Sequence, residues 1–123
     1  MGLRSVFQRA AQKGLAALID IAHTDITYHH TGTFEWSEEL LAVVETGGVD
    51  YLMGPTIIDE PRADEITDSP VVITDSKLYV AYLELPITLS TLDYVMIDLV
   101  RWNVKWFRSD AAQAIHKIFV RKA

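Results

Sequence analysis

Residues 92–107, LDYVMIDLVRWNVKWF, decide the fold. β-Branched and aromatic residues are concentrated in two short runs, 95–97 and 101–107, with turn-like residues between them. Strands favour such residues because branched and aromatic side chains pack well on a pleated surface. The stretch therefore predicts a β-hairpin. Strict alternation along its second strand places three side chains on one face, Trp102, Val104 and Trp106, and three on the other, Asn103, Lys105 and Phe107.

Similar extended patterns occur on both sides of this hairpin. The further predicted strands alternate or contain β-branched runs: 26–31, 40–46, 49–58, 71–73, 77–85 and 114–120. Residues 34–37 are expected to form a turn-like passage, and Gly54 and Pro55 predict a bend. Many short strands at such regular spacing predict a mainly β protein, a small antiparallel β-barrel or sandwich over residues 25–121.

The first segment has a helical period instead. Apolar side chains recur at spacings of three and four from Leu3 to Ala22, with charged and amide side chains mainly between them. This predicts one N-terminal amphipathic α-helix over 3–22, with core packing favoured over a partner interface for its apolar stripe. Gly14 costs about 1 kcal/mol relative to alanine inside a helix, which suggests the close approach of another backbone.

At 123 residues the chain has the length of one domain, residues 1–123, and it contains no cysteine. Disulfides, thiolate metal sites and cysteine nucleophiles are therefore excluded. Half of its residues are hydrophobic, but no uninterrupted apolar run near the N-terminus has the length of a signal peptide or a membrane span. We expect a soluble protein made in the host cytoplasm, with no membrane partner.

Negative charge is concentrated in the middle of the chain. Residues 34–75 hold eleven carboxylates and one basic side chain, Arg62, whereas both flanks are slightly basic and the formal net charge is −6. Such a block suits a solvated loop, a cation site or a surface that repels polyanions such as nucleic acid. Its breaker-rich part, about 59–70, is expected to be a mobile acidic loop.

Two sets of side chains carry possible metal ligands. The first set consists of carboxylates suited to calcium or magnesium: Asp59, Glu60, Asp64, Glu65 and Asp68. The second set surrounds the first predicted strand: His23, Asp25, His29 and His30. The carboxylates lack the ligand spacing and the central glycine of a calcium loop, and the two adjacent histidines point to opposite faces of a strand. We therefore predict no metal and no cofactor.

Patterns for catalysis and for nucleic-acid binding are also weak. No serine is flanked by glycines as in a nucleophile elbow, and Gly47-Gly48 lacks the lysine and the helix start of a phosphate loop. Arg101, Lys105 and Arg108 run beside tryptophans, as in single-strand binders, but the acidic net charge and the alternation favour core packing of the aromatic residues. We predict that the protein is not an enzyme.

Three parts of the sequence, in their order along the chain, carry a family resemblance. They are ITYHH at 26–30, VVITDSKLYVAYLELP at 71–86, and LDYVMIDLVRWNVKWF at 92–107 followed by AIHKIFVRK at 114–122. After an N-terminal helix, this layout resembles that of the head-closure proteins of long-tailed phages, also called stopper or head-tail joining proteins. The resemblance covers most of the chain.

Individual residues both follow and depart from the pattern of that family. Those that follow it are Asp93, Trp102, Val104 and residues 120–122. The departures are His30, which stands where arginine is common, and residues 98–100, which lack the usual glycine turn. The departures concern the first strand and the connection within the predicted hairpin.

The resemblance implies a virion protein of the phage neck, at the head-tail interface. Its implied form is a small β-barrel subunit in a homo-oligomeric ring that closes the DNA channel of the filled capsid and provides the tail attachment surface. Its implied partners are a portal-side adaptor protein and a tail-terminator or tail protein, while double-stranded DNA passes without specific binding. Two alternatives stay open: a tail-terminator or tail-completion protein, and a small metal- or ligand-binding protein.

Two sets of residues are candidates for these roles. An acidic channel wall would repel phosphate, whereas cations near DNA release counterions and add affinity. The candidate channel or gate loop therefore consists of Asp59, Glu60, Asp64, Glu65 and Asp68. A ring joins two different patches of neighbouring subunits, so a basic patch is also needed. The candidate ring or partner interface consists of Arg4, Arg9, Arg108, Arg121 and Lys122.

Overall fold

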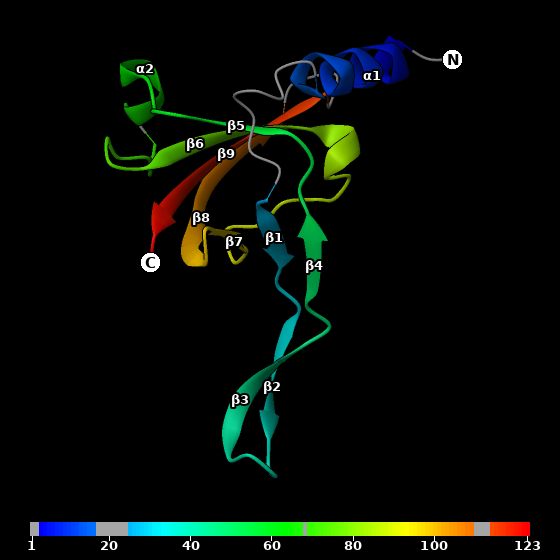
Figure 1. Cartoon of the computed structure of the whole chain (residues 1–123). Coiled ribbons are helices and arrows are strands. Elements are labelled where there is room, and N and C mark those ends of the chain that lie inside the picture. The colour runs from blue at the N-terminus through cyan, green and yellow to red at the C-terminus, as the bar shows by residue number, and fades with distance from the viewer. Residues whose placement is uncertain (1–2, 17–24, 68, 110–113) are drawn as a thin grey trace.

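Antiparallel strands dominate the computed structural model, which describes residues 3–16, 25–67, 69–109 and 114–123. The strands are β1 Thr27–His30, β2 Thr33–Ser37, β3 Ala42–Thr46, β4 Val49–Leu52, β5 Thr56–Asp59, β6 Ser76–Ala81, β7 Tyr94–Ile97, β8 Val100–Ser109 and β9 Ile115–Lys122. The helical segments are α1 Leu3–Ala16, α2 Ala63–Ile66 and the 3₁₀ turn η1 Tyr82–Glu84. Seven strands form one sheet in the order β4-β1-β7-β8-β9-β6-β5, and β2 pairs with β3 separately (Figure 1).

The seven-stranded sheet curls into a half-barrel around the hydrophobic core (Figure 1). Its edge strands, β4 and β5, follow each other in the chain and meet at a corner that contains Gly54 and Pro55. Core side chains such as Tyr28, Leu78 and Val95 are buried on the inner face. The predicted fold class, a mainly β antiparallel barrel or sandwich with an N-terminal helix, is confirmed.

The N-terminal helix differs from its prediction in two respects. It extends over Leu3–Ala16, and residues 17–24 of the predicted helix lie outside the described residues. Helix α1 contacts β6 and η1, where the Gln12 amide donates a hydrogen bond to Glu84 at 2.7 Å. The apolar side chains of its first turns are exposed: Leu3, Val6 and Phe7. The expected core packing is thus wrong for these turns. Among the described residues, no atom outside the helix lies within 4 Å of the position that a Cβ on Gly14 would take, so the structure gives no sign of the expected close approach.

Two other segments differ from the predicted strands. Residues 34–37, expected as a turn-like passage, belong to strand β2. Residues 71–73, expected as a strand, are irregular and lead into a turn, in which the Val72 backbone N–H donates to the Asp75 carboxylate at 2.9 Å. The predicted strand 77–85 ends at Ala81 and continues as η1.

The predicted hairpin of residues 92–107 is confirmed as β7 and β8. Only Asp98 and Leu99 connect the strands, and both have positive φ, 51° and 64°. Two successive positive φ values are typical of the type I′ turn, whose twist matches that of the flanking strands. Aspartate tolerates this backbone, but leucine is strained because its Cβ crowds the following carbonyl. The strained Leu99 is also 94% exposed.

A β-bulge in β8 changes the predicted faces of its aromatic residues. The register shifts between Val104 and Trp106, which leaves Lys105 as an extra residue without an opposite partner. An extra residue exchanges the two faces of a strand beyond it. Phe107 therefore packs against the core, whereas Trp106 stacks on Phe119 with 5.3 Å between the ring centroids. The predicted shared face of the two tryptophans is wrong for this reason.

Buried Asp93 ties β1 to the segment before β7. Its carboxylate accepts hydrogen bonds from the Tyr28 hydroxyl at 2.5 Å, the Thr31 backbone N–H at 2.8 Å and the Ser90 backbone N–H at 3.0 Å. His30 Nδ1 lies 3.0 Å from the same carboxylate. A buried carboxylate is stable only with such partners. Burial, together with the charge of Asp93, raises the pKa of Tyr28 above 10, so its hydroxyl remains a donor at neutral pH.

Replacing Leu99 with glycine should stabilise the protein, because glycine adopts positive φ without strain. We expect Leu99→Gly to raise the free energy of unfolding by about 1 kcal/mol in urea denaturation. Leu92→Gly is the matched control, because Leu92 is also an exposed leucine in a turn but has an ordinary φ. Equal effects of the two substitutions would show that the turn at Leu99 is not strained.

Candidate interaction surfaces

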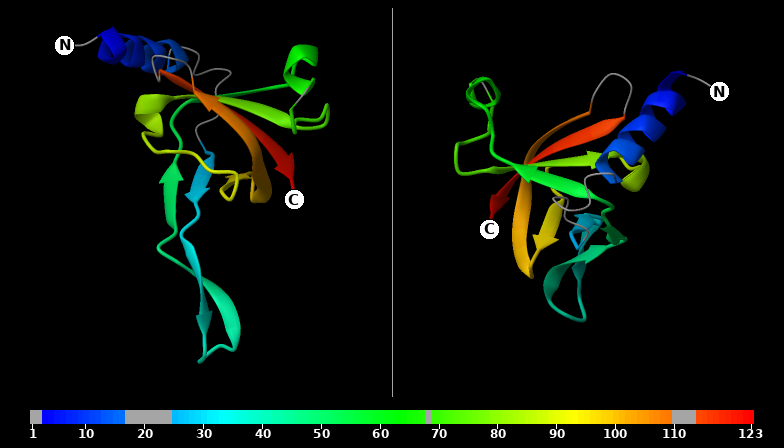
Figure 2. Two further views of the ribbon diagram at one scale, coloured as in Figure 1. Left: turned by 180° about the vertical axis from the view of Figure 1, so that it is seen from behind. Right: turned by 45° about the horizontal axis from the view of Figure 1, so that its top comes forward.

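A two-stranded arm projects from the half-barrel (Figures 1 and 2). The arm, residues 33–46, consists of β2, β3 and the connecting tip, residues 38–41. It continues the pairing of β1 with β4, because the residue pairs on both sides of the junction belong to one register. The chain therefore builds one long ribbon, half of which is part of the sheet while the other half has no neighbouring strand among the described residues.

The arm has an exposed apolar face. Phe34 and Trp36 on β2 and Val43 on β3 share this face and are 60%, 62% and 62% exposed. The alternation of Phe34, Glu35 and Trp36 is the sequence signal for this strand. A contiguous apolar patch of this kind marks an interaction site, and an isolated two-stranded ribbon is at best marginally stable in water. The arm is therefore the first candidate interaction surface.

Three glycines form the joint between the arm and the sheet: Gly32, Gly47 and Gly48. Gly47 has a φ of 79°, which favours glycine. A Cβ atom on Gly32 would lie 2.0 Å from the carbonyl oxygen of Thr46 and 2.6 Å from the backbone nitrogen of Gly48. Any larger residue at position 32 would therefore push the two strands of the ribbon apart.

His29 of β1 stabilises this joint by contacts with both the arm and the sheet. Its Nε2 lies 2.7 Å from a carboxylate oxygen of Glu45 on the arm, and its Nδ1 lies 2.6 Å from Asp50 on β4. The Glu45 carboxylate also accepts a hydrogen bond from the Gly32 backbone N–H at 3.3 Å. The imidazole stacks on Tyr94 of β7, with 4.5 Å between the ring centroids. One side chain thus joins the arm to two strands of the sheet.

The surroundings of His29 favour its protonated form. Burial alone would lower its pKa, but hydrogen bonds to Asp50 and Glu45 and the charges of both carboxylates outweigh it and raise the pKa above 6.5. A protonated imidazole can donate from both ring nitrogens, as this geometry requires. The Arg101 guanidinium lies 3.9 Å from the centroid of the neighbouring Tyr94 ring and adds a positive charge to the cluster.

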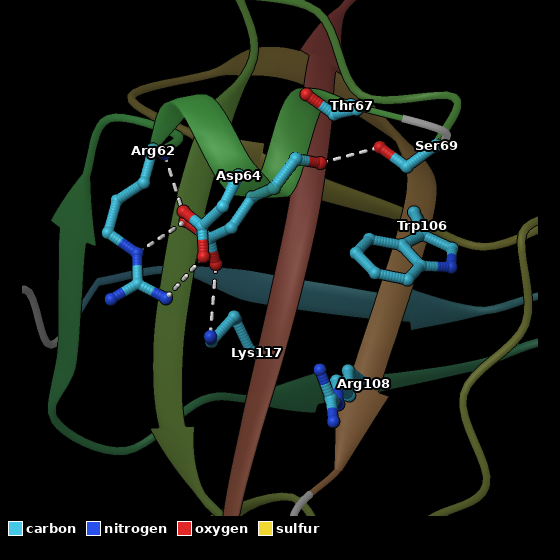
Figure 3. A pocket seen from close by; sticks show the side chains of 8 residues that line it. Arg62, Asp64, Thr67, Ser69, Trp106, Arg108 and Lys117 are labelled. Carbon is cyan, nitrogen blue, oxygen red and sulfur yellow. Dashed lines mark hydrogen bonds and ion pairs between the residues drawn. The ribbon is translucent and has the colours of Figure 1, made fainter.

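The second candidate surface is a pocket of about 160 Å³ between α2 and strands β8 and β9 (Figure 3). Glu65 of α2 forms its base, with a side chain only 7% exposed. Its carboxylate accepts hydrogen bonds from Lys77 at 2.6 Å, Lys117 at 3.0 Å and the Arg62 backbone N–H at 2.9 Å. Burial would raise the pKa of Glu65, but Lys77, this backbone N–H and Lys117 lower it to about 2. Glu65 is therefore ionised at any physiological pH.

The wall of the pocket carries excess positive charge and one aromatic face. Arg62, Arg108 and Lys117 line it, against the carboxylates of Glu65 and of exposed Asp64. Trp106 and Arg108 both come from β8 beyond the bulge, which turns them toward this pocket (Figure 3). The pocket is thus a cationic site on an acidic protein, and sequence reasoning missed it because the bulge is not visible in the alternation.

The carboxylates predicted as a channel loop do not form one surface. Asp59 and Glu60 are exposed at the end of β5, and Asp64 is exposed beside the pocket. Glu65 is buried among lysines, and Asp68 lies outside the described residues. The expected mobile loop is wrong for residues 63–66, which form α2, held by the bonds to Glu65.

The five predicted basic residues are dispersed. Arg4 and Arg9 are exposed on α1, Arg108 lines the pocket, and Lys122 is exposed at the end of β9. Arg121 has a structural contact instead: its Nε lies 2.7 Å from the buried Asp75 carboxylate. The structure therefore does not bring these residues together into one patch.

The two adjacent histidines among the candidate metal ligands have other partners. His29 and His30 point to opposite faces as predicted, one toward Glu45 and Asp50 and the other toward Asp93. His23 lies outside the described residues. Within the described ranges, no three histidine or carboxylate side chains are placed to hold one metal ion.

No helix in the described part of the chain has both the length and the apolar character needed to cross a bilayer.

No protein-family model and no curated protein matches this chain. The solution structure of protein SF1141 from Shigella flexneri 2a, a structural genomics target, is similar to it with a TM-score of 0.57. The similarity covers 84% of this chain and 95% of that protein, with 13% identical residues. At this identity the likeness concerns the fold alone.

The joint at His29 should make stability depend on pH. Because the folded protein raises the pKa of His29, its contribution is fully present below pH 6.5 and is lost as the pH rises through the folded pKa. His29→Gln should remove this component from the pH profile of the unfolding free energy. NMR titration of the His29 ring in the folded protein gives the direct check, and a pKa at or below 6.5 would contradict the account.

Among the carboxylates of residues 34–75, Glu65 should be the one whose replacement lowers the free energy of unfolding most. Glu65→Gln leaves Lys77 buried without a counter-charge and should lower the free energy of unfolding by about 3 kcal/mol. The effect should persist down to about pH 4.5 and vanish as the pH falls toward 2, because native Glu65 itself becomes protonated there. Asp64→Asn is the matched control, expected within about 0.5 kcal/mol of wild type in denaturant titrations.

Proposed function

We propose that this protein is a structural subunit of a tailed-phage neck, of the head-closure type that its sequence layout resembles. In this role it forms a homo-oligomeric ring between a portal-side adaptor and a tail-terminator or tail protein. The ring closes the DNA channel of the filled capsid and carries the tail. The subunit acts by assembly and needs no turnover or cofactor.

The exposed arm is the observation that supports this function best. Its apolar face of Phe34, Trp36 and Val43 has no cover within the described chain, while a glycine joint and the His29 contacts fix its direction. A fixed projecting apolar ribbon is suited to permanent contact with another subunit, where its burial would stabilise the assembly. An enzyme or a small-ligand binder has no evident use for it.

The charges are consistent with a ring around DNA. Exposed Asp59 and Glu60 remain candidates for the channel wall, where fixed negative charge would keep phosphates from adhering. The buried Glu65 cannot serve there, because its charge is already balanced by lysines. The formal net charge of −6 agrees with a protein that lets DNA pass rather than one that binds it.

Deleting the gene for this chain from its phage should yield DNA-filled heads that lose their DNA and carry no tails. Complementation with wild-type protein should restore infectious particles. Complementation with Phe34→Ser plus Trp36→Ser should fail, although circular dichroism and thermal melting show a folded protein, because only the apolar face of the arm is lost.

Ile73→Ser is the matched control, since Ile73 is an exposed apolar residue of the half-barrel, away from the arm. It should complement like wild type. Normal tailed particles after gene deletion would overturn the proposal. Heads that keep their DNA beside tails of abnormal length would instead indicate a tail-terminator protein.

A further inference from the structure

The cationic pocket beside α2 has unused binding capacity. Glu65 is occupied by two lysines, and Arg62 lies 3.4 Å from Asp64. Among the described residues, Arg108 has no ion pair, although it is exposed at the pocket. Since Trp106 adds an aromatic wall, the pocket suits a ligand that combines a carboxylate with an apolar group.

The tip of the arm has this combination of groups. Residues 38–41 read Glu-Glu-Leu-Leu, and all four side chains are exposed. Neither Glu38 nor Glu39 forms an ion pair in the described part of the chain. Leu41 also has a φ of 50°, a strained conformation for leucine that is tolerated where surrounding contacts or function require it.

The tip cannot reach the pocket of its own chain. The arm and α2 project from opposite ends of the half-barrel, as both views in Figure 2 and the view in Figure 1 show. Two complementary patches at opposite ends of one subunit make a head-to-tail contact, which closes into a ring when the rotation between subunits permits. The ligand for the pocket is therefore to be sought in another copy of the chain.

We propose that the acidic tip of the arm, residues 38–41, inserts into the pocket beside α2 of a neighbouring copy. A carboxylate of Glu38 or Glu39 pairs with Arg108, and a leucine of the tip packs on Trp106. This inference rests on the proposed ring and names the contact that joins its subunits.

The size of the pocket agrees with this contact. A volume of about 160 Å³ corresponds to roughly five water molecules, enough for the end of one or two side chains but not for a folded element. Before assembly, water would fill the pocket. The leucine side chain would displace this water, and ion pairs are stronger where water is excluded because the local dielectric constant is lower. The longer apolar face of the arm, toward its base, would then lie along the neighbouring subunit.

Disulfide trapping tests the contact, because the natural chain contains no cysteine. A chain with Leu41→Cys and Thr67→Cys has one thiol in the tip and one beside the pocket. Mild oxidation of the concentrated protein should give a ladder of dimers, trimers and higher species on a non-reducing gel. A chain with Thr33→Cys and Thr67→Cys, whose first thiol lies at the base of the arm, is the matched control and should give little ladder.

Charge reversal in the chain that carries Leu41→Cys and Thr67→Cys gives a second test of the contact. Arg108→Glu should reduce the ladder about tenfold, and adding Glu38→Arg with Glu39→Arg should restore it, because attraction returns with both signs reversed. Glu35→Arg, which lies on β2 outside the tip, should not restore the ladder. Circular dichroism confirms that each variant is folded.

Absence of a ladder, equal ladders from the tip and base thiols, or failure of the double reversal would each overturn the inference. The proposed function is decided separately by gene deletion. A neck defect without the ladder would leave a head-closure protein whose subunits join elsewhere, whereas a ladder without a neck defect would leave a head-to-tail polymer with another role.

Discussion

A two-stranded ribbon with a solvent-exposed apolar face depends on a partner, and this constraint sets the arm apart from the half-barrel that carries it. Within the described chain the arm is held only at its base, where Gly32 permits the close approach of the strands and His29 bonds to Glu45 and Asp50. Among the described residues, none of those in the arm belongs to the buried core of the half-barrel. Stability and interaction are thus assigned to different parts of the chain.

The charged side chains also divide into those that stabilise the half-barrel and those that are free to interact with a partner. The carboxylates of Glu65, Asp75 and Asp93 are buried and bound by lysine, arginine or hydrogen-bond donors, so they hold the body of the protein together. The carboxylates of the arm tip remain exposed, and the pocket beside α2 keeps Arg108 without an ion pair among the described residues. Separated patches of opposite charge give a subunit a direction, which a head-to-tail ring needs.

The sequence predicted those features that depend on local pattern. Alternation and β-branched residues predicted the β7–β8 hairpin and the strands β1 and β9. Helical spacing predicted α1. The features that it missed depend on tertiary contacts. One extra residue, Lys105, turns Trp106 toward the pocket, and the burial of Glu65 requires Lys117, which lies 52 residues away in sequence. The arm was predicted only in part: the predicted strand 40–46 corresponds to β3, whereas the residues of β2 were expected to form a turn-like passage although Phe34, Glu35 and Trp36 alternate.

Hydrogen exchange, followed by mass spectrometry in the isolated chain and in the assembled ring, shows whether a neighbouring subunit covers the arm. We expect the backbone amides of residues 33–46 to exchange rapidly in the isolated chain and to become strongly protected in the assembly. The amides of β8 and β9 should be protected in both states. An arm that is equally protected, or equally unprotected, in both states would contradict the claim that it is built to be covered by a neighbour.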